Sequence, residues 1–237
     1  MLLSILGGGD IQTIIISLLI SLPVIMLALA FHETAHGFVA WKCGDNTAYN
    51  LGRLTLNPIK HLDPMGLLCM LVFGFGWAKA VPVDTRNFRN PKRGMALTAV
   101  AGPAANLLLG AVSAVFYGIA LSVWAYFYYT NAAAFAVNCA YWLAQLCYLG
   151  AIYNFILMVF NLIPVPPFDG SRIALVFLPP KAYFGIMQYE RQIMFGILIA
   201  LLVIDRFWNF SPFSWVAEQL TNLISSPVCN LTLRLFN

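Results

Sequence analysis

One stretch of this chain, from Gly94 to Phe168, contains no aspartate, glutamate, lysine or arginine. About 25% of the residues in a soluble domain are charged, so an uncharged run of this length is not expected in such a domain. The whole chain of 237 residues is 61% hydrophobic and only 9% charged, with a mean hydropathy of +0.80. Because it cannot cover itself with polar surface, the chain belongs in a lipid bilayer. We therefore predict an all-α polytopic membrane protein.

Four segments are predicted to cross the membrane, since a spanning helix needs about 20 mostly apolar residues. Residues 12–41 supply the first, and a polar, turn-prone break at 129–133 divides the long uncharged run into two more. A fourth span is expected from about residue 183 to 204. Residues 62–78 are apolar but short and glycine-rich, so they either span or dip in and return. The expected total is four to six transmembrane helices.

Two short stretches, 52–57 and 78–83, alternate in the manner of strands. Pro82 suits an edge strand, because proline has no N–H to donate to a neighbour. These stretches flank residues 62–78, and we predict that the three together form a short re-entrant element that resembles a β-hairpin.

Three ionisable side chains appear near the end of the first apolar segment, in the sequence HETAH at residues 32–36. His32 and His36 are four residues apart, so they project from one face of a helix, one turn apart. Two imidazoles placed in this way can bind one Zn²⁺, and Glu33, about 100° around the helix, can reach a metal-bound water as general base. Ionisable residues inside a membrane segment are functional by default, so we favour a zinc site over two core histidines that occur by coincidence.

A catalytic zinc ion has three protein ligands and keeps its fourth position for water, so a third ligand is needed. The first acid after the uncharged run is Asp169, in the sequence NLIPVPPFDG at residues 161–170. Three prolines within four residues stop a helix, and Asp-Gly permits a sharp turn. Unwound backbone at membrane depth is tolerated where it lines a cavity or is buried in protein. Asp169 is therefore the leading candidate, and a simple turn residue is the alternative.

His61 competes with Asp169 for the role of third ligand, because it lies at the mouth of the 62–78 segment. We rank a surface or structural histidine first, a gate that occupies the open position of the metal second, and a primary ligand third.

The distribution of lysine and arginine predicts the orientation in the membrane. If the histidines meet Asp169, the first and third spans end on the same side, and residues 62–78 must re-enter. With this topology all lysines and arginines except Arg206 and Arg234 lie on one face. Cytoplasmic loops carry such an excess, so the two motifs are expected to lie toward the cytoplasm.

The two motifs together resemble the site-2 protease family of intramembrane zinc metalloproteases, peptidase family M50. The family pattern N-x-x-P-x-P-x-x-D-G is matched in full from Asn161 to Gly170. The sequences GRLTLNPIKHLDPMG, GWAKAVPV and AGPAANLLL are similar to the compact prokaryotic branch without a PDZ domain, and neither the 42–61 loop nor the 79–93 loop could hold such a domain. The resemblance covers roughly residues 20–205.

The resemblance implies one zinc ion per chain, held by His32, His36 and Asp169, with Glu33 activating a water. It also implies a substrate that is itself a transmembrane helix, cut within or near the bilayer. We expect residues 1–237 to form a single transmembrane metalloprotease domain with its core at about 12–205. Residues 206–237 are expected to form an interfacial helix or an additional membrane segment.

Two asparagines in otherwise apolar spans, Asn161 and Asn106, are candidates for binding an oxyanion or an unwound substrate. The alternative is hydrogen bonding between helices, which is equally weighted for Asn161 and preferred for Asn106. Broken helices around Asp169 and Pro103 are expected to line an aqueous pocket.

The expected partners are a membrane-spanning protein substrate and the lipid bilayer, with no nucleic acid and an open oligomeric state. The expected location is the prokaryotic inner or plasma membrane. Two other functions are considered, namely an inactive family member that binds membrane proteins and a zinc transporter. The intact set of His32, Glu33, His36 and Asp169 argues against the inactive member, and a transporter gives Glu33 no necessary role.

Overall fold

The computed structural model describes residues 10–73, 76–174 and 211–236, with single positions between 185 and 200. This part of the chain is helical and contains no strand. Three of its helices are long and apolar enough to cross a membrane, over residues 15–42, 91–129 and 134–161. The prediction of an all-α polytopic membrane protein is confirmed. Most of the expected fourth span, 183–204, lies outside the described residues.

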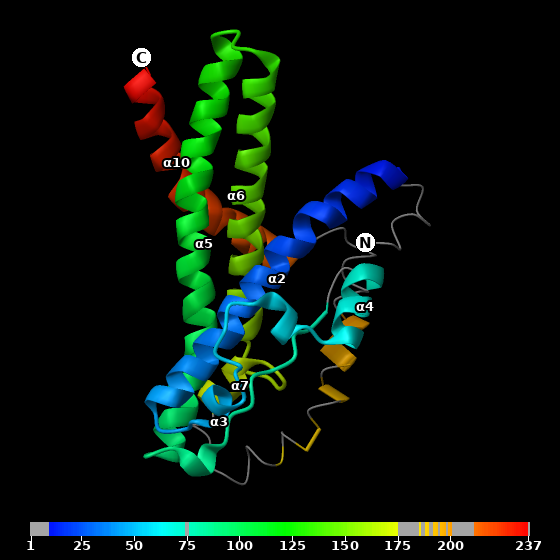
Figure 1. Cartoon of the computed structure of the whole chain (residues 1–237), viewed down its shortest axis with the longest axis vertical. Helices are drawn as coiled ribbons and strands as arrows, with labels where there is room; N and C mark the ends of the chain where they lie inside the picture. Colours follow the sequence, from blue (N-terminus) through cyan, green and yellow to red (C-terminus); the bar gives the residue numbers. More distant parts are fainter. Residues whose placement is uncertain are drawn as a thin grey trace. The chain divides into compact units, whose positions relative to one another are not determined.

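The chain divides into two compact units, which are described separately. Unit 1 comprises residues 1–105 and 161–196, and unit 2 comprises 106–160 and 197–237. The long helix of unit 1 is α2 (Ile11–Lys42), which carries the HETAH motif in its last three turns (Figure 1). After it come short elements, namely α3 (Thr47–Asn50), η1 (Pro58–His61), α4 (Pro64–Phe73) and η2 (Thr85–Asn87).

A buried carboxylate, Asp45, ties the end of α2 to the loop that precedes the next long helix. It accepts hydrogen bonds from the backbone N–H of Thr47 (3.1 Å), the hydroxyl of Thr47, the backbone N–H of Asp84 (2.7 Å) and Nδ2 of Asn87 (2.9 Å). Burial by itself would raise the pKa of Asp45, but these hydrogen bonds hold it below its usual value. The segment that ends at residue 84 is thereby anchored to α2.

The predicted strands at 52–57 and 78–83 are wrong as secondary structure, because neither stretch forms a ladder. Side chains form hydrogen bonds with backbone groups that would bond to a neighbouring strand in a ladder. The carbonyl of Thr55 accepts from Thr34 Oγ1 and from His61 Nε2, each at 2.7 Å. The first stretch, 52–57, is therefore fixed by individual side chains.

The second stretch, 78–83, is held in the same way. Arg53 donates from Nη2 to the carbonyl of Lys79 at 2.8 Å, and the backbone N–H of Val81 donates to Glu33 Oε2 at 2.8 Å. These two bonds connect residues 26 and 48 positions apart in the chain.

Residues 62–78 return to the place where they begin. Leu62 and Ala78 form an isolated antiparallel bridge, and the N–H of Lys79 donates to the carbonyl of His61 at 2.8 Å. The helix between them, α4, has ten residues and reaches about 15 Å, whereas a bilayer core is about 30 Å thick. Gly66 packs against the backbone of Trp77 so closely that a Cβ would not fit. This is the geometry expected of a re-entrant segment.

Helix α5 (Pro91–Tyr129) is continuous through Pro103, so the expectation of a broken helix there is wrong. Proline removes one backbone hydrogen bond, but helices in membranes tolerate this loss because neighbouring groups satisfy the freed carbonyl. The predicted break at 129–133 is confirmed, since α5 ends at Tyr129 and α6 (Ala134–Asn161) begins after a short turn (Figure 1). Asn131 has φ of 53°, a left-handed value that asparagine adopts more readily than most residues.

Unit 2 is a bundle of the later part of α5, most of α6 and α10 (Pro212–Phe236). Its buried core consists of Ala114, Ala151, Ile152, Phe155 and Ala217.

Helix α10 runs along α5 in the same direction. A Cβ at Gly118 would lie 3.0 Å from Val228 Cβ, Ser122 Oγ is 2.6 Å from Thr232 Oγ1, and the rings of Tyr126 and Phe236 stack at 4.8 Å. From one pair to the next, the residue number rises by four on both helices, so the two helices run in the same direction. Helix α10 is not among the three described helices that are long and apolar enough to cross a membrane, and the choice between an interfacial helix and an additional membrane segment stays a prediction.

Candidate metal centre

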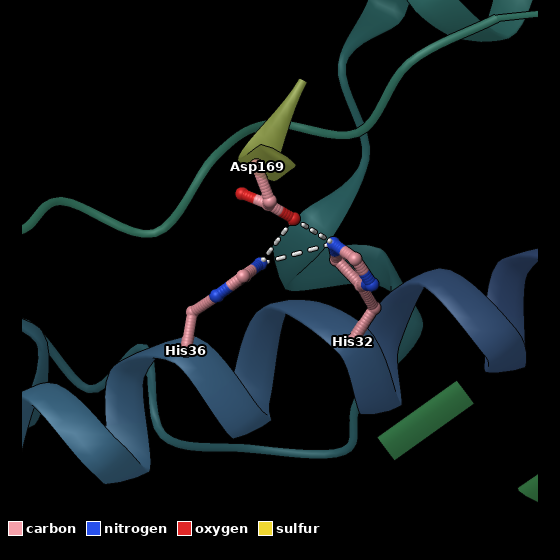
Figure 2. Close-up of side chains that lie close together, drawn as sticks. All are labelled: His32, His36 and Asp169. Carbon is pink, nitrogen blue, oxygen red and sulfur yellow. Dashed lines mark hydrogen bonds and ion pairs between the residues drawn. The ribbon is translucent and has the colours of Figure 1, made fainter. Parts of the chain in front are cut away.

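Three side chains far apart in the sequence converge in unit 1, as Figure 2 shows. His32 Nε2 and His36 Nε2 each lie 3.1 Å from Asp169 Oδ2, and the two nitrogens are 3.0 Å apart. The histidines come from one face of α2, and Asp169 is the first residue of α7 (Asp169–Ala174). Both imidazoles are buried. Within the described part of the chain, these residues are the one group of histidine, cysteine and acidic side chains that could hold a metal ion.

The proline-rich segment brings Asp169 to the histidines. Helix α6 ends at Asn161, and residues 162–168 have no regular structure, as the three prolines predict. Gly170 packs directly on the carbonyl oxygens of Leu162 and Ile163, where a Cβ would not fit. The chain therefore doubles back on residues 162–163, and this turn positions the carboxylate.

The spacing of the three atoms fits a tetrahedral zinc ion. Ligand atoms about 2.0–2.1 Å from such an ion lie about 3.3 Å apart, close to the observed 3.0–3.1 Å. Burial by itself would raise the pKa of Asp169, but its close contacts with the imidazoles of His32 and His36 hold it well below its usual range. The carboxylate is therefore ionised, as a metal ligand must be.

The hydrogen bond on the far side of His36 fixes the proton of its ring. His36 Nδ1 lies 2.6 Å from the carbonyl oxygen of Thr98 on α5. A carbonyl only accepts, so Nδ1 carries the proton and Nε2 of the neutral ring presents a lone pair. That lone pair faces His32 Nε2 and the Asp169 carboxylate, so a cation or a proton can lie between these atoms. Two imidazoles and a carboxylate are ligands that zinc accepts.

Glu33 is close in sequence to both histidines but does not join the three-atom group. Its Oε2 accepts the hydrogen bond from the N–H of Val81. The carboxylate is thus held by the 78–83 segment, and it is not a member of the candidate ligand set.

Sequence reasoning missed three contributors to this centre, namely Val81, Thr98 and Gly102. Val81 and Thr98 act through backbone groups, which every residue has. Gly102 contributes by having no side chain, because a Cβ there would meet the rings of both histidines. The sequence signal that could have drawn attention to Gly102 is its place in AGPAAN, between small residues.

His61 lies apart from the three ligand candidates and is not on the surface, since only 1% of it is exposed. Its Nε2 donates to the carbonyl of Thr55, and its ring lines a small apolar cavity beside Met70 and Trp77. This placement is that of a structural histidine that holds the 52–57 stretch.

We expect that His61→Phe leaves the zinc content unchanged and lowers stability. The ring volume is retained, but the donor to Thr55 is lost, which costs about 0.5–1.5 kcal/mol. Metal analysis and thermal unfolding of the purified protein check the two parts. A fall in zinc content at unchanged folding would contradict the structural role and restore the gate or ligand hypotheses.

The two asparagines lie outside the three-atom group. Asn106 is fully buried in α5, and neither atom of its amide has a hydrogen-bond partner among the described residues. Asn161 is the last residue of α6 and is half-buried. Their suggested roles toward a substrate stay predictions.

Comparisons with known proteins identify similar chains. The model of peptidase family M50 matches residues 131–204. A Bacillus subtilis protein, "Putative zinc metalloprotease YwhC", is 42% identical over 183 residues, which are 76% of this chain and 78% of that protein.

More distant relatives carry a related name. "Putative zinc metalloprotease Rip2" of Mycolicibacterium smegmatis is 28% identical over 198 residues, covering 80% of this chain and 70% of the relative. The protein of the same name from Mycobacterium tuberculosis strain H37Rv is 26% identical over 205 residues, covering 81% of this chain and 71% of the relative. No solved structure matches the chain. The predicted resemblance is confirmed, and the chain belongs to peptidase family M50.

Proposed function

We propose that this protein is a zinc metalloprotease that hydrolyses peptide bonds within or near the transmembrane segments of membrane proteins. The observation that carries the proposal is the three-atom group of His32, His36 and Asp169, which lie 3.0–3.1 Å apart. Two of these residues belong to a helix that is long and apolar enough to cross a membrane. Membership of family M50 supports the class of reaction.

Each residue of the centre has a distinct role in this proposal. His32, His36 and Asp169 hold one zinc ion per chain, which when bound supplies Lewis-acid activation of a water and of a carbonyl group. Glu33 takes a proton from the attacking water and passes it to the leaving amine nitrogen. The N–H of Val81 binds one oxygen of Glu33, and the other oxygen is the one that would accept the proton.

The substrate proposed is a transmembrane helix, because two of the three candidate ligands lie on a helix that is long and apolar enough to cross a membrane. A helical substrate hides its carbonyls and must unwind before attack. Once unwound, the substrate presents its carbonyls as an extended peptide. Asn161 and Asn106 are candidates for holding that peptide or stabilising the oxyanion.

The proposed location is the plasma or inner membrane of a prokaryote, with the active site toward the cytoplasm. The basis is the distribution of lysine and arginine, which are concentrated in the stretches between residues 42 and 93. Cytoplasmic loops carry this bias in multi-pass proteins.

The experiment that tests the function uses the full chain in lipid vesicles with a membrane-spanning test peptide. The expected result is cleavage that stops when a chelator removes zinc and resumes when zinc is returned. A soluble peptide of similar length serves as the control and is expected to be cut more slowly. Bound zinc without cleavage of several spanning peptides would favour an inactive family member, and zinc flux across the vesicles would favour a transporter.

A further inference from the structure

The turn of α5 from Thr98 to Gly102 lies directly against both candidate metal ligands on α2. A Cβ built at Gly102 would meet His36 Nε2, would lie 2.5 Å from His32 Cε1, and would lie 2.6 Å from His36 Cε1. Ordinary contacts of a Cβ begin at 3.4 Å. The backbone of α5 therefore approaches the two imidazoles at a distance that only glycine permits.

The two rings are held by polar contacts on their other sides. His36 is held on one side by the carbonyl of Thr98 at 2.6 Å and on the other by Asp169 at 3.1 Å. His32 is buried, and its Nε2 lies 3.0 Å from Nε2 of His36. A Cβ at position 102 must therefore displace either α5 or the pair of rings.

The same displacement would break the hydrogen bond between His36 Nδ1 and the Thr98 carbonyl, which determines which ring nitrogen of His36 carries the proton. Thr98 and Gly102 are four residues apart and share one face of α5, so a shift at one is transmitted to the other. Moving from 2.5–2.6 Å to ordinary contact requires a shift of roughly 1 Å, which would stretch the bond between His36 and Thr98 to about 3.6 Å, beyond hydrogen-bond range.

We propose that Gly102 is a positioning residue of the metal centre. By omitting a side chain, it lets the Thr98 carbonyl reach His36 Nδ1 and keeps both Nε2 atoms aimed at the metal. Bonds of this outer shell raise metal affinity by about 10–100-fold in other proteins. This inference rests on the proposed zinc site and identifies a determinant of its affinity outside the ligands.

The test compares two glycine-to-alanine variants within α5, G102A and G110A, in the full chain in detergent. A Cβ at Gly110 would lie 2.8 Å from the buried ring of Phe155, so G110A introduces similar crowding without touching a histidine. Zinc is removed and then titrated back against a competing chelator. Co²⁺ is bound in a parallel sample, and its visible absorption spectrum reports the geometry of the ligands.

We expect G102A to bind zinc at least about 10-fold more weakly than wild type and to change the Co²⁺ spectrum. G110A is expected to lose thermal stability but to keep the zinc affinity and the Co²⁺ spectrum of the wild type. Equal zinc affinity and equal spectra in G102A and wild type would overturn the role of Gly102. Wild-type protein that binds no zinc would overturn the proposed function itself, so the two failures are distinguishable.

A measurement on the wild type covers the case in which G102A does not fold. The chain has three histidines, and nitrogen NMR of labelled histidine distinguishes the two neutral ring forms. The structure requires the Nδ1–H form for His36, bonded to Thr98, and the Nε2–H form for His61, bonded to Thr55. An Nε2–H form at His36 would overturn the inference.

Discussion

Replacing Glu33 with glutamine is expected to abolish peptide cleavage while zinc remains bound. Glutamine keeps the length of the side chain and can still accept from the N–H of Val81, but it cannot take a proton from water. Loss of a general base lowers the rate by roughly 10²–10⁴-fold. Because Glu33 is outside the group of His32, His36 and Asp169, the metal ligands are unchanged. Cleavage rate and zinc content, measured on the same preparation, check both parts.

A matched control for this change is Glu218→Gln. Glu218 is exposed on α10, so the same loss of a carboxylate is expected to leave cleavage and zinc content at wild-type values. Wild-type cleavage by Glu33→Gln would show that another group accepts the proton. Loss of zinc in that variant would instead make Glu33 a ligand.

Replacing Asp169 with asparagine is expected to remove zinc as well as activity. The carboxylate contributes the negative charge of the centre and lies 3.1 Å from both histidine nitrogens. An amide keeps the shape but loses that charge. The fall in zinc affinity should exceed the roughly 10–100-fold cost of changing an outer-shell group. Titration of the metal-free protein with zinc against a competing chelator gives the value.

The control for Asp169→Asn is Asp84→Asn, which removes an acid whose partner is the exposed guanidinium of Arg86. Exposed ion pairs contribute little to stability, so zinc affinity and unfolding temperature should stay close to wild type. If Asp169→Asn bound zinc as tightly as wild type, the carboxylate would not be a ligand.

The parts of the centre that the sequence predicts are those fixed by local geometry. Helical periodicity alone puts His32 and His36 on one face of α2. Prolines end α6 at Asn161 and turn the chain toward Asp169. The turn at 129–133 follows from polar residues between two apolar runs, one of which, Asn131, takes the left-handed conformation.

The parts of the centre that the sequence does not predict depend on contacts between segments that are distant in the chain. Alternation in 52–57 and 78–83 indicates strands but does not reveal that Thr34, His61 and Glu33 bind their backbone groups. For the same reason the contribution of Thr98, which acts through its carbonyl, leaves no pattern in the sequence.

X-ray absorption at the zinc edge of the purified full chain tests the central claim most directly. The account predicts one zinc ion per chain, surrounded by nitrogen and oxygen at about 2.0–2.1 Å, with the scattering pattern of two imidazoles. The chain also has five cysteines, and a sulfur ligand would appear at about 2.3 Å. A sulfur shell, a single imidazole, or protein that retains no zinc would contradict a centre built from His32, His36 and Asp169.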